Sequence, residues 1–398
     1  MYISMKFLSK IKRLFKPSKY SKKIFIENWG FENRGDQLMI QSVMEQIRKY
    51  EPHAQILVRK HVFGQNPTFC IQNRLYPLEL KNTGIRCSKL YAWIVNLLLR
   101  DEWINTPRQI DLILNCRGYY IADKWIIDND SVSSLECFYK QFNKKGRRLI
   151  MLPQAFGPFE NEYSKKAINI IYERADMIYA REQQSYEYLS KVCSNTDKIK
   201  VVPDFTCLCQ EEQYPSIQLP KKEYVLLIPN ARMVDKTSAN VSNSYLDFLI
   251  QIVSDLREQG ENVYLLNHEG AGDEQLMHEI NKKLDVEMPI LTNLSGTEIK
   301  ALIKNAKLLI SARFHGVVSG LTQGVPTLCT SWSHKYGELL REHGCENNML
   351  EVNDISSSLK TIHEALAQPE KYSSKEGCED VIENRVNQMW NEIFIDDK

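Results

Sequence analysis

The chain has 398 residues, of which 43% are hydrophobic and 25% are charged, and its formal net charge is +1 at pH 7. This length suits two domains of about 150–200 residues each, and the composition is that of a globular protein with a large core. The near-neutral charge argues against a general nucleic-acid binder, which usually carries a basic excess, so we expect no nucleic-acid partner.

Residues 1–23 are strongly basic, with eight lysine or arginine side chains and no acidic one. Their apolar residues recur at helical spacing, as expected either for a helix on an anionic membrane surface or for a solvated arm. No signal peptide is indicated, because lysines interrupt the apolar residues. The longest apolar run, residues 90–99, is shorter than the roughly 20 residues that cross a bilayer. We expect a cytoplasmic protein, peripheral on the inner face of the membrane if the arm binds there.

The ten cysteines include no C-x-x-C pair, which favours reduced, buried thiols and no structural metal. The triplet Asp128-Asn129-Asp130 fits a metal-binding pattern, but such triplets are frequent in turns. We therefore predict that the protein has no metal site.

The first half of the chain alternates short apolar runs with amphipathic segments. The predicted strands are Ile24–Glu27, Ile56–Val58, Leu112–Asn115, Leu149–Leu152, Met177–Tyr179 and Lys200–Val202, and the predicted helices include Gln37–Tyr50 and Ser164–Arg174. Such alternation predicts a parallel sheet covered by helices on both faces.

A second series of apolar runs follows a polar segment, Gln210–Lys222, which contains two prolines and suits a linker. The strands predicted here are Tyr224–Ile228, Asn262–Leu266, Pro289–Leu291, Leu308–Ser311 and Thr327–Cys329. We predict an α/β protein with two Rossmann-like domains, residues 24–212 and 223–375, that face each other across a cleft. The apolar stripe of the last predicted helix, Val381–Phe394, suggests that residues 376–398 pack back onto the first domain.

Several polar residues follow the predicted strands closely. Asn33, Gly35 and Asp36 come after the first strand, where Asp36 can either cap the next helix or face the cleft. Gln154 follows the fourth strand in a loop with two prolines, where it either shapes a turn or hydrogen-bonds a sugar hydroxyl.

Arginines stand at the carboxyl ends of strands in both halves. Arg181 follows the fifth strand, while Arg313 and His315 follow Leu308–Ser311, ahead of a helix that we expect to open at Gly316. A guanidinium group and a helix N-terminus both favour phosphate or carboxylate. Two such arginines across a cleft suggest a small ligand with two anionic groups, although Arg181 could instead pair with Glu182 and His315 could simply cap its helix.

Together these segments resemble the polysaccharide pyruvyl transferase family. The shared motifs, in order, are Asn33-x-Gly35-Asp36, Pro153-Gln154-x-x-Gly157-Pro158, Ala180-Arg181-Glu182-x-x-Ser185, Pro203-Asp204, Arg313-Phe314-His315, Gly324-Val325-Pro326 and Lys335. The resemblance implies a fold like that of two-domain GT-B glycosyltransferases. It also implies transfer of a pyruvyl group from phosphoenolpyruvate to a sugar, usually as a cyclic ketal, with Arg181, Arg313 and His315 at the donor.

On this basis we assign Arg313, Lys335 and the helix N-terminus at Gly316 to the donor phosphate, and Arg181 to the donor carboxylate. His315 is expected to transfer a proton. Asp36 is the preferred base for the acceptor hydroxyls, ahead of His268 and Asp273, which follow the strand Asn262–Leu266.

We assign Asn33, Gln154 and Asp273 to the acceptor, a sugar or a lipid-linked oligosaccharide. Phosphoenolpyruvate is a substrate in this scheme, and no cofactor is expected. One departure concerns the acceptor side. Where many family members have Gly-Gly after the third strand, this chain has Asn115-Cys116-Arg117-Gly118-Tyr119, so the acceptor sugar cannot be carried over.

Two rival functions remain open. A GT-B glycosyltransferase that uses a nucleotide sugar would usually have a glutamate in the helix after the phosphate-binding loop, but residues 316–323 contain no acid. A non-enzymatic scaffold at the membrane would tolerate Arg313→Ala and would require residues 1–19 instead.

Overall fold

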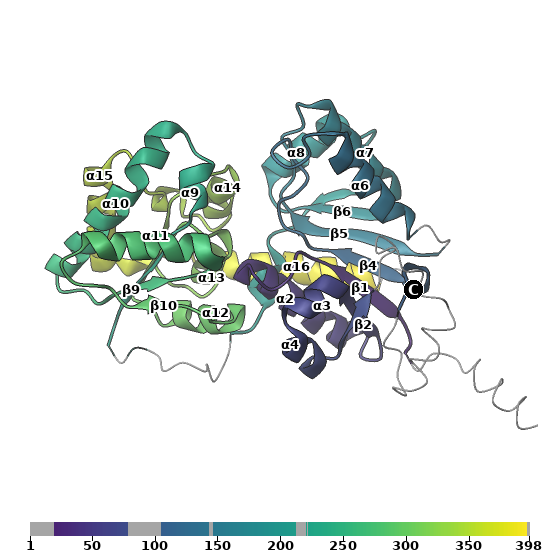
Figure 1. Ribbon diagram of the computed structural model, residues 1–398, viewed down its shortest axis with the longest axis horizontal. Coiled ribbons are helices and arrows are strands. Elements are labelled where there is room, and N and C mark those ends of the chain that lie inside the picture. Colours follow the sequence, from purple (N-terminus) through teal and green to yellow (C-terminus); the bar gives the residue numbers. More distant parts are fainter. Residues whose placement is uncertain (1–19, 79–104, 143–145, 212–219, 221, 396–398) are drawn as a thin grey trace, which may run out of the picture.

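The computed structural model describes residues 20–78, 105–142, 146–211, 220 and 222–395. Their elements form two lobes that lie side by side (Figure 1). In the N-terminal lobe seven strands of the described chain form one parallel sheet in the order β3-β2-β1-β4-β5-β6-β7. The strands are β1 (Lys23–Glu27), β2 (Gln55–Arg59), β3 (Leu75–Leu78), β4 (Leu112–Asn115), β5 (Arg148–Gln154), β6 (Met177–Ala180) and β7 (Ile199–Val201).

Helices cover both faces of this sheet. They are α2 (Arg34–Tyr50), α3 (Lys60–Gln65), α4 (Pro67–Gln72), α6 (Asn129–Lys140), α7 (Glu162–Arg174) and α8 (Gln183–Val192), with 3-10 turns η1 (Pro107–Gln109) and η2 (Phe205–Leu208). Successive strand residues point to opposite faces, so Ile24 and Ile26 pack with α2 while Phe25 packs with α6 and α7. Burial on both faces explains why these strands read as continuous apolar runs.

The C-terminal lobe has the same architecture with a smaller sheet. Five strands of the described chain form a parallel sheet in the order β10-β9-β8-β11-β12. The strands are β8 (Val225–Ile228), β9 (Val263–Leu266), β10 (Ile290–Leu291), β11 (Leu308–Ser311) and β12 (Thr327–Cys329). The helices are α9 (Arg232–Asp235), α10 (Ala239–Glu258), α11 (Gly270–Lys283), α12 (Gly296–Lys304), α13 (Phe314–Leu321), α14 (Lys335–Glu342) and α15 (Ile355–Ala367), with 3-10 turns η3 (Glu346–Asn348) and η4 (Pro369–Tyr372).

The predicted fold class, two α/β lobes with parallel sheets, is confirmed. Every predicted strand is present to within two residues at each end. Strand β3 was not predicted, because it contains Pro77; it lies at the edge of its sheet, where a missing N–H is tolerated. The carboxyl ends of parallel strands within each sheet lie on one edge, and this edge carries the loops described below.

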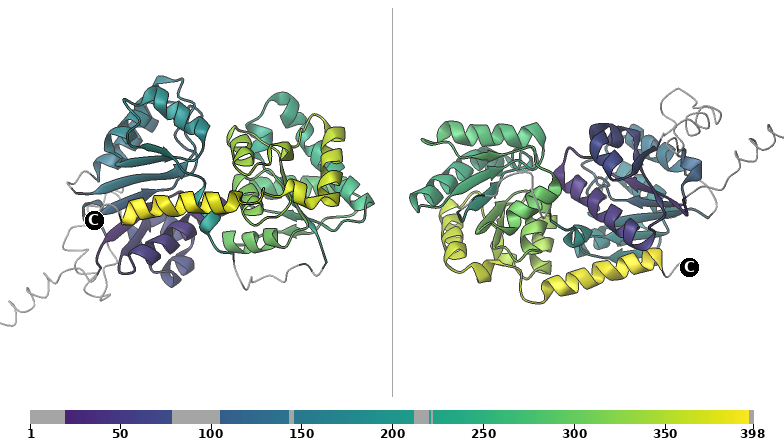
Figure 2. Two further views of the ribbon diagram at one scale, coloured as in Figure 1. Left: turned by 180° about the vertical axis from the view of Figure 1, so that it is seen from behind. Right: turned by 90° about the horizontal axis from the view of Figure 1, so that it is seen from below.

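The final helix, α16 (Cys378–Phe394), leaves the C-terminal lobe and runs along the N-terminal lobe (Figure 2). Ile382, Val386 and Trp390 join the core formed by β1, β4 and α2. The Trp390 ring stacks on Phe394 and meets Phe205 of η2 edge-on, with ring centroids 6.0 and 6.1 Å away. The helix thus ties the two lobes together through apolar contact.

Some expectations fall outside the described residues: residues 1–19 of the basic arm, the apolar run 90–99, and most of the predicted linker 210–222. Within the described part of the chain, no helix combines the length and apolar character needed to span a bilayer. Asp128 caps α6 by accepting a hydrogen bond from the Ser131 N–H at 2.8 Å.

Replacing Trp390 by alanine should destabilise the N-terminal lobe by about 3–5 kcal/mol, because the fully buried ring leaves a cavity that the core cannot fill. Val381→Ala in the same helix is the control, since Val381 is 58% exposed and should change stability by less than about 0.5 kcal/mol. Urea denaturation followed by circular dichroism measures both. Equal stability of the two variants would show that α16 does not hold this core together.

Candidate functional site

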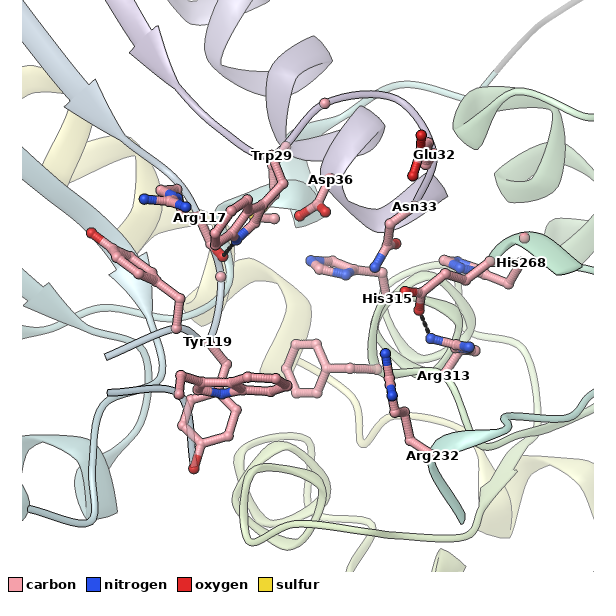
Figure 3. A pocket seen from close by; sticks show the side chains of 18 of the residues that line it. Trp29, Glu32, Asn33, Asp36, Arg117, Tyr119, Arg232, His268, Arg313 and His315 are labelled. Atoms are coloured by element: carbon pink, nitrogen blue, oxygen red, sulfur yellow. Dashed lines mark hydrogen bonds and ion pairs between the residues drawn. The ribbon is translucent and has the colours of Figure 1, made fainter. Parts of the chain in front are cut away.

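A cavity of about 1220 Å³ lies between the two lobes. Its walls include segments at the carboxyl ends of β1, β2, β4 and β6 in the N-terminal lobe and of β8, β9, β11 and β12 in the C-terminal lobe. In Figure 3, Trp29, Asp36 and Arg117 face His268, Arg313 and His315 across this space. Residues that are far apart in the sequence therefore share one concave, aromatic and charged site, which is typical of a ligand-binding cleft.

The N-terminus of α2 forms one wall, and its cap is Asn33 rather than Asp36. The Asn33 side chain accepts a hydrogen bond from the Gly35 N–H at 2.8 Å. A Cβ atom at position 35 would lie 2.1 Å from His315 Nδ1, so only glycine lets α2 approach this imidazole. The Asn33-x-Gly35-Asp36 motif thus serves contact between the lobes, while Asn33 also lines the cavity.

Asp36 lines the cavity from the first turn of α2. Burial raises its pKa to about 7, against the opposing effects of Arg117 and Lys335. A carboxyl group with this pKa is present in both protonation states near neutral pH. Asp36 can therefore either give or take a proton in the cavity.

His315, on the first turn of α13, lies next to Asp204 of the other lobe, with Nε2 and Oδ2 3.6 Å apart. Burial lowers the pKa of His315 to about 4, against the effect of Asp204. Burial alone would raise the pKa of Asp204, but His315, Arg181 and Thr206 outweigh it and hold that pKa below its ordinary value. The pair therefore places a neutral imidazole against a carboxylate at neutral pH.

Arg181 connects the lobes from the end of β6. Its Nη1 donates to Asp204 at 3.1 Å, and its guanidinium carbon lies 3.9 Å from the centroid of the Phe314 ring. Its Nε and Nη2 atoms are buried without a hydrogen-bond partner, although Nε lies 3.7 Å from Glu182. Arg181 lines the cavity and keeps donors that a bound anion can use.

The role predicted for Arg313 requires a correction, because its guanidinium group is already paired with two carboxylates. Nε donates to Asp273 at 2.8 Å, Nη2 donates to the other oxygen of Asp273, and Nη1 pairs with Glu269. Arg313 stands at the N-cap position of α13 without a side-chain capping hydrogen bond, and this helix begins at Phe314 and not at Gly316. Gly316 does not line the cavity, and a Cβ there would lie 2.7 Å from Ser311 Oγ, so this glycine permits close packing on β11.

Asp273 lines the cavity, but its carboxylate is paired with Arg313, and this corrects its assignment to the acceptor. It has no exposed surface, lies within α11 and also accepts a hydrogen bond from the Ala231 N–H at 3.0 Å. Gln154 is a second correction. It too has no exposed surface, does not line the cavity and donates to Asn115 from inside the sheet.

Lys335 begins α14 and is only 9% exposed. Its Nζ lies 4.7, 5.1, 5.6 and 5.7 Å from the ring centroids of Trp332, Phe314, Tyr336 and Tyr119, respectively. Among the described residues, no carboxylate lies within ion-pair distance of it. Burial, followed by repulsion from Arg181, lowers the pKa of Lys335 to about 7. This amine sits in an aromatic box where an anion would stabilise its charged form.

His268 lines the cavity beside Arg313 (Figure 3) and is 2% exposed. Burial and the neighbouring Arg313 hold its pKa well below the usual range, so the ring is neutral. Neither ring nitrogen has a hydrogen-bond partner. The structure thus brings together Asn33, Asp36, Arg181, His268, Asp273, Arg313, His315 and Lys335.

The aromatic rings around Lys335 and the ion pair of Glu269 with Arg313 were not predicted from the sequence. Asp204 was named only as part of a shared motif. The signal for Trp332 was its position three residues before Lys335, but an isolated tryptophan does not identify a site.

The fold is shared with solved structures of sugar-nucleotide epimerases and a glycosyltransferase. The UDP-GlcNAc 2-epimerase from Neisseria meningitidis, bound to UDP-GlcNAc, aligns with a TM-score of 0.58 at 11% identity, covering 94% of this chain and 99% of that one. The UDP-GlcNAc 2-epimerase of Methanocaldococcus jannaschii gives 0.57 at 13% identity, covering 92% and 99%. A glycosyltransferase from Rickettsia africae gives 0.53 at 12% identity, covering 95% and 100%. At these identities the likeness establishes a GT-B fold and no more.

The sequence itself matches a family. The sequence model described as polysaccharide pyruvyl transferase aligns with residues 33–334, most of the chain. This span runs from the cap of α2 to the residue before Lys335, so it contains nearly all the residues that line the cavity. The chain therefore belongs to the polysaccharide pyruvyl transferase family.

Proposed function

We propose that the protein transfers the pyruvyl group of phosphoenolpyruvate to a sugar of a polysaccharide precursor, forming a cyclic ketal and releasing phosphate. The observation that carries this proposal is the Lys335 amine, which is buried in an aromatic box and faces no carboxylate at ion-pair distance in the described chain. A buried ammonium group without a partner is costly, and a bound dianion would compensate it. Arg181, whose Nη2 is unpaired, lies on the same cavity.

Phosphoenolpyruvate carries a phosphate and a carboxylate on the same enol carbon. In the proposed complex Lys335 pairs with the phosphate and Arg181 with the carboxylate. Arg313 joins them only if Glu269 moves away, because this carboxylate, 28% exposed, occupies its outer nitrogen. Asp273 stays in place and orients the guanidinium group. These side chains supply the positive charge, so the scheme includes no metal or cofactor.

The chemistry needs a proton for the methylene carbon and a base for two hydroxyl groups. Protonation of the methylene makes the adjacent carbon electrophilic, one hydroxyl adds, phosphate leaves, and a second hydroxyl closes the ketal. Asp36 suits the proton transfers, because its pKa of about 7 lets it act in either direction. His315 is neutral at first, and the charge of a bound donor would raise its pKa so that it can protonate the departing phosphate.

The proposed acceptor is a lipid-linked oligosaccharide at the inner face of the cytoplasmic membrane. The basic residues 1–23 support this proposal, since a polybasic segment with apolar residues binds anionic lipid. A cavity of about 1220 Å³ also leaves room for a sugar beside a small donor.

The proposal predicts that phosphoenolpyruvate raises the melting temperature of the protein while UDP and GDP do not. At a ligand concentration 100 times Kd, binding adds about 2.7 kcal/mol of stability. Incubation with phosphoenolpyruvate and a panel of glycosides should yield a product heavier by one pyruvate less one water in mass spectrometry. Stabilisation by UDP, with no ketal from any glycoside, would instead support a nucleotide-sugar glycosyltransferase.

Asp36→Asn should lower kcat by roughly 10²–10⁴-fold, because the amide cannot transfer a proton. The affinity for phosphoenolpyruvate should change by less than about threefold, since Asp36 is not a donor ligand in this scheme. Any limb near pH 7 in the profile of kcat against pH should disappear in the variant. Glu45→Gln, in the same helix but away from the cavity, is the matched control. Retention of full activity by Asp36→Asn would remove Asp36 from the mechanism.

Glu269→Gln should tighten the binding of phosphoenolpyruvate by roughly three- to tenfold, because the carboxylate no longer competes for Arg313. Asp273→Asn should weaken it, because Arg313 then loses the partner that orients it. Isothermal titration calorimetry measures both effects. Changes in the same direction for the two variants would contradict the proposed exchange of Glu269 for the donor.

A further inference from the structure

The cavity extends beyond Asp36, over the carboxyl ends of β1, β2 and β4 of the N-terminal lobe. This part, here called the β1–β4 subsite, is lined by Trp29, Arg59, Arg117, Tyr120 and Ser131. None of these residues takes part in the donor scheme above. In Figure 3, Trp29 and Arg117 lie together on the opposite side of Asp36 from Arg313.

Two arginines in this subsite share one buried carboxylate. Glu27 has no exposed surface, and Arg59 donates to both of its oxygens, with Nε at 2.7 Å from Oε2. Arg117 approaches Glu27 only to 3.5 Å, and its Nε is buried without a hydrogen-bond partner. Two guanidinium groups and one carboxylate leave a net charge of +1 at the cavity wall. Burial raises the pKa of Asp36, which lines the same cavity, and the positive charge of Arg117 opposes this rise.

The Arg117 guanidinium group also lies over two aromatic rings. Its central carbon lies 3.4 Å from the centroid of Trp29 and 4.4 Å from that of Tyr120. The Trp29 Nε1–H donates to the Arg117 carbonyl at 3.1 Å, so the indole is fixed in orientation. Trp29 is nevertheless 48% exposed. A rigid, half-exposed indole at the edge of a cavity offers an apolar surface to a ligand.

We propose that the β1–β4 subsite binds the acceptor, that a sugar ring packs on Trp29, and that an anionic group of the acceptor, a carboxylate or a phosphate, pairs with Arg117. This inference rests on the proposed function and deepens it by naming the chemical class of the acceptor.

The test measures the affinity of the full-length protein, without phosphoenolpyruvate, for pairs of sugars that differ in one charged group. Methyl glucuronide is compared with methyl glucoside, methyl galacturonide with methyl galactoside, and glucose 1-phosphate with methyl glucoside, by calorimetry. The first two pairs report a carboxylate and the third reports a phosphate. The acidic member of at least one pair should bind roughly tenfold more tightly, as expected for a charge-assisted contact. Equal binding within all three pairs would overturn the proposal.

Arg117→Gln should reduce this preference to less than about threefold and leave the affinity for phosphoenolpyruvate unchanged. Arg341→Gln, at a side chain 61% exposed on α14, is the control and should keep the wild-type preference. If Arg117→Gln does not fold, Arg117→Lys replaces it, and should weaken binding of the acidic member alone because the planar fork is lost. An unchanged preference in the folded variant would contradict the assignment.

The two proposals fail separately. If phosphoenolpyruvate does not bind the wild-type protein, the proposed function fails. The comparison of acidic and neutral sugars would still show whether the β1–β4 subsite prefers an anionic sugar. If Arg117→Gln loses phosphoenolpyruvate rather than the acidic sugar, Arg117 belongs to the donor site and the acceptor inference is overturned.

Discussion

The site depends on the buried contact of His315 with Asp204 and Arg181 across the two lobes. Asp204 accepts from Arg181 and lies 3.6 Å from the imidazole, while Gly35 leaves room for that imidazole against α2. Burying such groups is expensive unless they are paired, so the lobes meet where charges can compensate one another. Burial at this contact, against the effect of Asp204, lowers the pKa of His315 and keeps the imidazole neutral, and the contact places Arg181 beside Phe314. The arrangement of the proposed donor site follows from it.

Much of the fold could be predicted from the sequence, because parallel strands buried on both faces leave continuous apolar runs. Leu308–Ser311 and Thr327–Cys329 were placed to the residue. The edge strand β3 was missed, since Pro77 is a poor strand residue except at a sheet edge. The edge position itself is set by the order of strands, which local sequence does not encode.

The site was predictable only where position along a strand decides the outcome. Arg181 and Arg313 do lie at strand ends and line one cavity. The partners of these arginines come from distant segments. The sequence therefore could not show that Asp273 and Glu269 form ion pairs with the Arg313 guanidinium group. Gln154 was placed in the site because we expected it to follow a strand. It is instead the last residue of β5, and its side-chain amide donates to Asn115 within the sheet. Residue type and spacing thus locate the site, and tertiary pairing decides which groups are available.

The central claim is that cations from both lobes form one donor site. A crystal structure of the protein with phosphoenolpyruvate tests it most directly. We expect the phosphate within hydrogen-bond distance of Lys335 Nζ, the carboxylate at Arg181, and Glu269 displaced from Arg313. Phosphoenolpyruvate bound outside this cavity, or held within it by one lobe alone with the pair of Arg313 and Glu269 intact, would contradict the account.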